Sequence, residues 1–285
     1  MTAHHMPDEL TAGSLSRRDV LRASGGVFGL SGGGTSAGPA ISFRPDCPDA
    51  TTRPAMRDCE DATTAGCADE HPRTKELRDE ATRALERDFS TVGALLEDGF
   101  VPYFDLLTDG DSGGWSHWLN PRYIGDESIL DAGRPAAIMV DNKWWRPLGV
   151  MFVATRDGEQ LDDPPSVYGG ADEDADARCS PWHHHVGLPG RYAWWKYQQV
   201  WGDGAETGLR LPCRTPCMMH VWTLPNPNGV YAHGPPPQGS RGGPPAEPAG
   251  FETSATPGED ELGVDVLAEE LLNSTVAERS RRRDS

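Results

Sequence analysis

The chain has 285 residues, of which 36% are hydrophobic, with 33 glycines, 25 prolines and a formal net charge of −18. This composition predicts one globular domain between long segments that pack no core, and it excludes the broad basic surface of a nucleic-acid-binding protein. Only three of the 26 basic residues are lysine, and carboxylates are in excess. This composition is typical of a halophilic, salt-adapted protein, because concentrated salt screens the repulsion between its carboxylates. An ordinary acidic protein is the alternative.

An arginine pair, Arg17 and Arg18, stands near the N-terminus. It precedes a weakly apolar, glycine-rich stretch at about residues 20 to 30, which is too short to cross a bilayer as a stable helix. Residues 1–38 therefore resemble a twin-arginine export signal. The resemblance implies the twin-arginine translocation machinery as partner, an extracellular or cell-envelope location and no transmembrane span; a non-functional or uncleaved leader is the alternative. Because this route carries folded proteins, it also favours a metal loaded before export.

Six cysteines form two groups along the chain. Residues 39–72, rich in Gly, Thr, Pro and Asp without periodicity, predict a disordered acidic linker, and this linker holds Cys47, Cys59 and Cys67. The second group is Cys179, Cys213 and Cys217. Disulfides suit an exported protein, but spacing does not determine their pairing, and we favour one within the second group. A structural zinc site on Cys179-x3-His183 and Cys213-x3-Cys217 is the alternative.

Residues 73–233 are expected to form the globular domain. Apolar residues at helical spacing predict a helix over about 73–98 that ends at Gly99. From residue 100 to about 232, short apolar runs such as A-A-I-M-V and M-M-H-V-W-T-L alternate with turn residues, and all nine tryptophans lie here. This pattern predicts a mainly β, α+β fold: a small antiparallel barrel or sandwich, cupin-like at most.

The C-terminal part is expected to add one helix to this domain. Residues 234–258 are rich in Pro and Gly and predict a coreless linker. Residues 259–285 predict an amphipathic helix over about 259–279, with a tail whose arginines suit the helix dipole.

The histidines are the strongest chemical signal. In W-H-H-H-V, a strand would project His183 and His185 to one face and His184 to the other, where we expect it to be exposed. Two imidazoles need a third ligand, and His220 and His117 lie among apolar residues of two other segments. We therefore predict a site for a copper, zinc or iron ion on His117, His183, His185 and His220. The remaining four, His4, His5, His71 and His233, are expected to be solvated.

Residues from about 90 to 233 resemble a family of small exported microbial proteins without an assigned function. The matching pieces are G-G-W-S-H-W-L-N-P, P-L-G-V-M-F-V, W-H-H-H-V-G-L and M-M-H-V-W-T-L-P-N-P-N-G-V-Y-A. The resemblance implies a β-rich domain with the four predicted ligands at a shared polar centre. His183-x-His185 and the later His220 are also similar in order to cupin metal ligands, although no acid follows until Asp203 and the cupin glycines are absent.

Two functions follow from these patterns. The first is an exported protein that binds a transition metal through clustered histidines. The second is a non-catalytic ligand-binding or envelope-associated module whose histidines are structural, which would expose tryptophans such as Trp144, Trp145, Trp194, Trp195 and Trp201. No nucleophile or phosphate-binding motif is present, so the sequence does not decide whether the protein is an enzyme.

Overall fold

A computed structural model describes residues 47–103, 114–170, 172–201, 210–243, 249–263 and 265–267, and the side chains of 200 and 201 are not among them. All of these residues belong to one unit of the chain, residues 36–285. The export signal predicted at 1–38 lies outside the described residues, as do His4 and His5.

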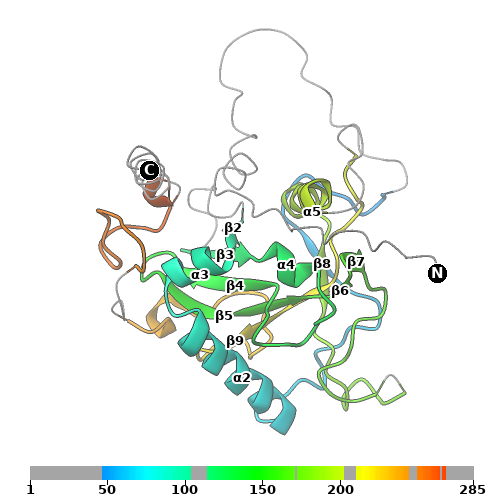
Figure 1. The fold of residues 1–285 in the computed structure, drawn as a ribbon. Coiled ribbons are helices and arrows are strands. Elements are labelled where there is room, and N and C mark those ends of the chain that lie inside the picture. The colour runs from blue at the N-terminus through cyan, green and yellow to red at the C-terminus, as the bar shows by residue number, and fades with distance from the viewer. Residues whose placement is uncertain are drawn as a thin grey trace, which may run out of the picture. The chain divides into compact units, whose positions relative to one another are not determined.

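The centre of the fold is one seven-stranded sheet in which every neighbouring pair is antiparallel (Figure 1). Its order is β1-β8-β9-β5-β4-β3-β2. The strands are β1 Met56–Asp58, β2 Val101–Pro102, β3 Trp115–Leu119, β4 Ala137–Asp141, β5 Arg146–Val153, β8 His183–His185 and β9 Met218–Trp222. A small hairpin, β6 Thr155–Arg156 with β7 Glu159–Gln160, stands apart. The antiparallel α+β prediction is confirmed, but β1 and β2 are not paired with each other, so the sheet is unclosed and the expected barrel is wrong.

Helices cover both faces of this sheet. Figure 1 shows α2 Pro72–Asp88 and α5 Leu188–Trp201 on opposite sides of it. Along β5, Val150 and Phe152 join the core cluster that contains the buried face of α2, whereas Met151 and Val153 join the cluster that contains Trp194 of α5. The period-two alternation of the strands thus divides the interior into two cores.

The helix predicted over 73–98 is two helices. α2 ends at Asp88, with Phe89 as its C-cap. α3 Val92–Asp98 starts after Thr91, whose side chain accepts a hydrogen bond from the Ala94 amide. A threonine in extended conformation is a favourable N-cap, so a new helix begins here instead of the first continuing. Gly99 ends α3 with φ of 92°, as predicted. Two short elements follow, α4 Pro121–Ile124 and the 3-10 turn η2 Gln238–Ser240.

Two stretches predicted as linkers are part of the folded unit. Within 39–72, β1 pairs with β8, because the cysteines on either side of β1 are bonded to the core. Within 234–258, Arg241 is 4% exposed and its Nη1 lies 3.3 Å from Asp141 Oδ2. A buried ion pair is a folded contact that a coreless linker would not make.

The predicted C-terminal helix is also wrong at its start. Residues 257 to 260 form a turn closed by a β-bridge between Pro257 and Asp260, and Leu262 is buried. Helical structure is described only at 265–267. The rest of the predicted helix, with the arginine tail, lies outside the described residues.

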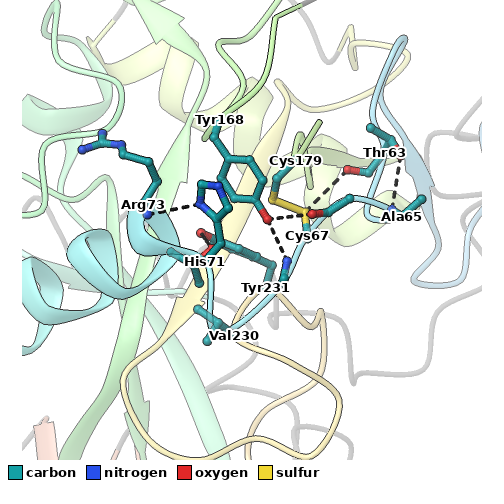
Figure 2. The surroundings of a disulfide bond; sticks show 12 residues. Thr63, Ala65, Cys67, His71, Arg73, Tyr168, Cys179, Val230 and Tyr231 are labelled. Atoms are coloured by element: carbon teal, nitrogen blue, oxygen red, sulfur yellow. Dashed lines mark hydrogen bonds between the residues drawn. A yellow bond between two sulfur atoms is a disulfide. The ribbon is translucent and has the colours of Figure 1, made fainter. Parts of the chain in front are cut away.

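Three disulfides join the two cysteine groups: Cys47–Cys213, Cys59–Cys217 and Cys67–Cys179. The expected disulfide within the second group is therefore wrong, and so is the zinc alternative, because all of its thiols are bonded. Figure 2 shows Cys67–Cys179 beside the stacked rings of His71 and Tyr168. Disulfides persist in oxidising compartments, so three of them suggest an extracellular protein. No helix in the described part of the chain is long and apolar enough to cross a membrane.

Candidate metal centre

Five histidines converge on one face of the sheet, the face covered by α5. Neighbouring rings in this group have centroids 4.9 to 5.5 Å apart. The group, called the histidine centre below, consists of His117, His183, His185, His220 and His233. All four predicted ligands are present, and His233 is added to them.

Strand alternation places the two β8 histidines as predicted. The rings of His183 and His185 lie together with centroids 5.5 Å apart, and His184 points to the other face. In the register of β8 on β9, His183 faces Met218, so His220 is two positions further along and on the same face. This diagonal neighbour has its ring centroid 5.3 Å from that of His183.

His117 reaches the centre because the sheet is curved. It lies on β3, which is separated from β9 by β4 and β5. Three strand spacings amount to about 14 Å in a flat sheet, yet His117 Nε2 lies 3.3 Å from His220 Nε2. The two side chains therefore converge from a concave face. A register shift between Met139 and Val140 of β4 is the kind of bulge that bends and twists a sheet.

Hydrogen bonding determines which nitrogen of His220 is available. Its Nδ1 lies 3.0 Å from the backbone carbonyl oxygen of His233. Because a carbonyl can only accept, Nδ1 carries the proton and donates it. In the neutral ring Nε2 then presents its lone pair towards His117.

His183 carries a buried nitrogen without a partner. The residue is 5% exposed, and no group in the described part of the chain forms a hydrogen bond with its Nε2. A ligand nitrogen of His183 lies within 4.8 Å of those of His185 and His233, and these three could hold a metal ion. Leaving a buried polar atom unpaired is costly, so this nitrogen is the atom of the centre that most requires a ligand.

Four imidazoles of the centre, those of His183, His185, His220 and His233, favour the neutral form. Burial, reinforced by neighbouring imidazoles, lowers the pKa of His183 and of His220 well below the usual 6.5. Burial also lowers the pKa of His185 to about 3 and lowers that of His233. Only neutral imidazole binds a metal, so little proton competition remains near neutral pH.

His233 as a whole residue is exposed, as expected, but its ring turns into the centre, with its centroid 4.9 Å from that of His183, and is partly desolvated there. The chain reverses after β9: Gly229 has φ of 99°, and the Trp222 amide donates to the Val230 carbonyl at 2.9 Å. The dipeptide Asn228-Gly229 is a turn signal. A chain reversal predicted at this dipeptide would have placed His233 close to β9, and therefore close to His220.

Two other histidines differ from their predictions. His184, expected to be exposed, is half-buried, with Nδ1 3.6 Å from Cys59 Sγ. The trio Cys59, His184 and Cys217 could hold a metal by position, but both sulfurs are in a disulfide. His71, expected to be solvated, is half-buried; it stacks on Tyr168 with centroids 3.6 Å apart and accepts from the Arg73 amide at the start of α2 (Figure 2).

Comparison with known proteins found no matching family model, no matching curated protein and no matching solved structure. The resemblance of residues 90–233 to small exported microbial proteins, like the cupin similarity in ligand order, therefore stays a prediction. Any function must be argued from the geometry of the histidine centre.

Proposed function

We propose that this chain is an exported, salt-adapted protein that binds a copper, zinc or iron ion at the histidine centre. The observation that carries the proposal is the Nε2 of His183, which is buried and unpartnered in a ring that lies beside three other imidazoles, those of His185, His220 and His233. A purely structural cluster would be expected to satisfy that nitrogen within the protein.

The spacing of the ligand atoms supports this proposal. Bonds of about 2.0 to 2.1 Å arranged tetrahedrally around one ion place nitrogens about 3.3 to 3.4 Å apart. His117 Nε2 and His220 Nε2 are 3.3 Å apart. The same distance suits a hydrogen bond from His117 to His220 in the metal-free protein, which the ion would replace.

The surroundings of His220 support it further. Metal-binding histidines usually donate their second ring N–H to a carbonyl or carboxylate, which fixes the tautomer and orients the ring. The Nδ1 of His220 donates to the His233 carbonyl. Because the same loop also supplies the His233 ring, it would position one ligand while contributing another.

Five imidazoles do not select one metal, since copper, zinc and iron all accept nitrogen ligands. An ion with an open position would supply Lewis-acid or redox chemistry. His117, His185 and His233 line a cavity beside the centre, so an open position would face that cavity.

The alternative, a module that recognises a ligand through an exposed tryptophan surface, has less support. Trp145 and Trp194 are 3% and 8% exposed, and Trp144 and Trp195 are half-buried; the side chain of Trp201 is not described. Trp115 and Trp222 lie beside imidazoles of the centre instead: their ring centroids are 4.6 Å from that of His117 and 5.5 Å from that of His220, respectively.

The test is the metal content of the protein after purification in high salt through its export route. We expect one ion per chain by mass spectrometry, lost in H183A/H220A and retained in H184A, which removes an imidazole from the other face of β8. Near-UV circular dichroism establishes that each variant is folded. Absence of metal from the folded wild-type protein, even after incubation with Cu(II), Zn(II) and Fe(II), would overturn the proposal.

A further inference from the structure

The cavity beside the histidine centre has a volume of about 350 Å³. It lies on the concave face of the sheet, between strand residues such as Met151 and Met218 and α5 residues such as Trp194 and Tyr197. Ligand-binding pockets commonly have volumes of about 300 to 1,000 Å³. An apolar cavity of about 150 Å³ already accommodates benzene, so this one has room for a two-ring molecule.

The lining of this cavity excludes charged ligands. Charged residues make up 25% of the chain, yet none occurs among the 20 described residues that line the cavity. At the average frequency, about a quarter of them would be charged. Burial of an unpaired charge is strongly unfavourable, so the cavity suits an uncharged molecule.

Aromatic side chains form much of its wall. Trp194 and Tyr197 stack with ring centroids 4.9 Å apart and an interplanar angle of 10°, and Tyr103 and Trp115 also line the cavity. Flat rings favour offset or edge contacts with other flat rings. A planar aromatic ligand therefore fits these walls better than a flexible aliphatic chain.

The polar end of such a ligand would meet the imidazoles of the histidine centre. The hydroxyls of Thr215 and Tyr197 already donate to the carbonyls of Pro216 and Pro121. The imidazoles of His117, His185 and His233 form the polar part of the wall. A hydroxyl or ring nitrogen would thus be directed to the histidine centre.

We propose that this cavity binds a small, uncharged aromatic molecule of one or two rings and presents its oxygen or nitrogen donor to the metal centre. The presentation of the donor to a metal rests on the proposed function, whereas the binding of the ring does not. The two parts therefore fail separately.

The first experiment titrates 2-naphthol and 6-hydroxy-2-naphthoate, which share a ring system and differ by one carboxylate, into metal-free protein by calorimetry. We expect 2-naphthol to bind and the carboxylate to bind at least about tenfold more weakly, because its charge would be buried. No binding of 2-naphthol, or equal binding of both compounds, would overturn the assignment of the cavity.

A pair of variants on α5 locates the binding. Ala193 lines the cavity and Gln198 does not. A193F should fill the space and weaken 2-naphthol binding at least about tenfold, while Q198F should leave it within about twofold. Equal effects of the two substitutions would place the ligand elsewhere. Metal content measured on Q198F should equal that of the wild type.

The final experiment uses Co(II)-loaded protein, because the visible spectrum of Co(II) reports its ligands. We expect 2-naphthol to change this spectrum at the concentration that saturates the cavity. An unchanged spectrum with bound 2-naphthol would overturn the presentation of the donor to the metal. If the protein binds 2-naphthol but takes up no metal on incubation with Cu(II), Zn(II), Fe(II) or Co(II), the proposed function is overturned and the cavity assignment stays intact.

Discussion

The two faces of β8 both present histidine side chains, but these side chains lie beside different groups. His183 and His185 project into the histidine centre, where nitrogen atoms face one another. His184, between them, projects towards the sulfur of Cys59 on the other face. Both faces bring together three groups that could hold a metal. On the sulfur face two of the three are already covalently bonded to each other.

This difference separates a structural face from a binding face. Cys59–Cys217 ties the end of β1 to the start of β9, and the two cysteines are 158 positions apart in the chain. It therefore restrains the strands that carry the histidines. On the nitrogen face no bond satisfies His183 Nε2. The sulfur face holds the strands together, and the nitrogen face retains the capacity to bind.

The largest expected effect comes from removing the disulfide on the sulfur face. C59A/C217A should lower the free energy of unfolding by about 2 to 5 kcal/mol, measured with denaturant, because the unfolded chain gains freedom. The two remaining disulfides limit this gain. Metal content per folded molecule should stay at the wild-type level, because the sulfur face supplies no ligand.

A loss of metal from the folded C59A/C217A protein would contradict the distinction between a structural sulfur face and a metal-binding nitrogen face. It would show that the sulfurs, or strand positions that only the disulfide maintains, belong to the metal site. H184A distinguishes these two cases, because it removes the third member of the sulfur-face trio and leaves the disulfide in place.

A smaller effect is expected at Gly190 on α5. A Cβ at this position would lie 2.9 Å from His185 Cβ and 3.3 Å from Thr215 Cγ2, so G190A should displace His185. Loss of ligand orientation commonly weakens metal affinity by about 10- to 100-fold, and we expect the lower end of that range. G239A, where nothing lies within 4 Å, is the control and should match the wild type.

The last prediction is a pH dependence measured on metal-free protein. The pKa of His185 is lowered from 6.5 to about 3 in the folded state by burial, so between these values the unfolded chain binds the extra proton. Stability should therefore be fully present above pH 6.5 and fall as the pH is lowered towards about 3. Each such group contributes up to about 1.4 kcal/mol per pH unit.

Between about pH 6 and pH 4, H185N should reduce the number of protons taken up on unfolding by about one, which makes the pH dependence of stability shallower. Denaturant unfolding at each pH measures this slope. The carboxylates titrate in both proteins, so the difference between the two curves isolates the histidine. An unchanged slope would mean that His185 is protonated as easily in the folded protein as in the unfolded one, and that its ring faces solvent.

Local patterns predicted much of the candidate site. Alternation along W-H-H-H-V predicted that His183 and His185 share a face, because a strand projects alternate side chains to opposite sides. The apolar surroundings of His117 and His220 predicted that they belong to the same centre. The N-cap at Thr91 was missed, although a capping threonine is itself a local signal.

By itself, the sequence determined features set by neighbouring residues: the strand alternation, the end of α3 at Gly99, the antiparallel β-rich class and four of the five histidines. The tertiary structure alone decided the pairing of the six cysteines, the curvature that brings β3 within reach of β9 and the packing of residues 47–72 and 234–243 on the domain. The physical reason is the distance along the chain over which each interaction acts. Backbone sterics and capping act over a few residues, whereas disulfides, sheet curvature and burial depend on segments more than 100 positions apart, whose meeting no local pattern encodes.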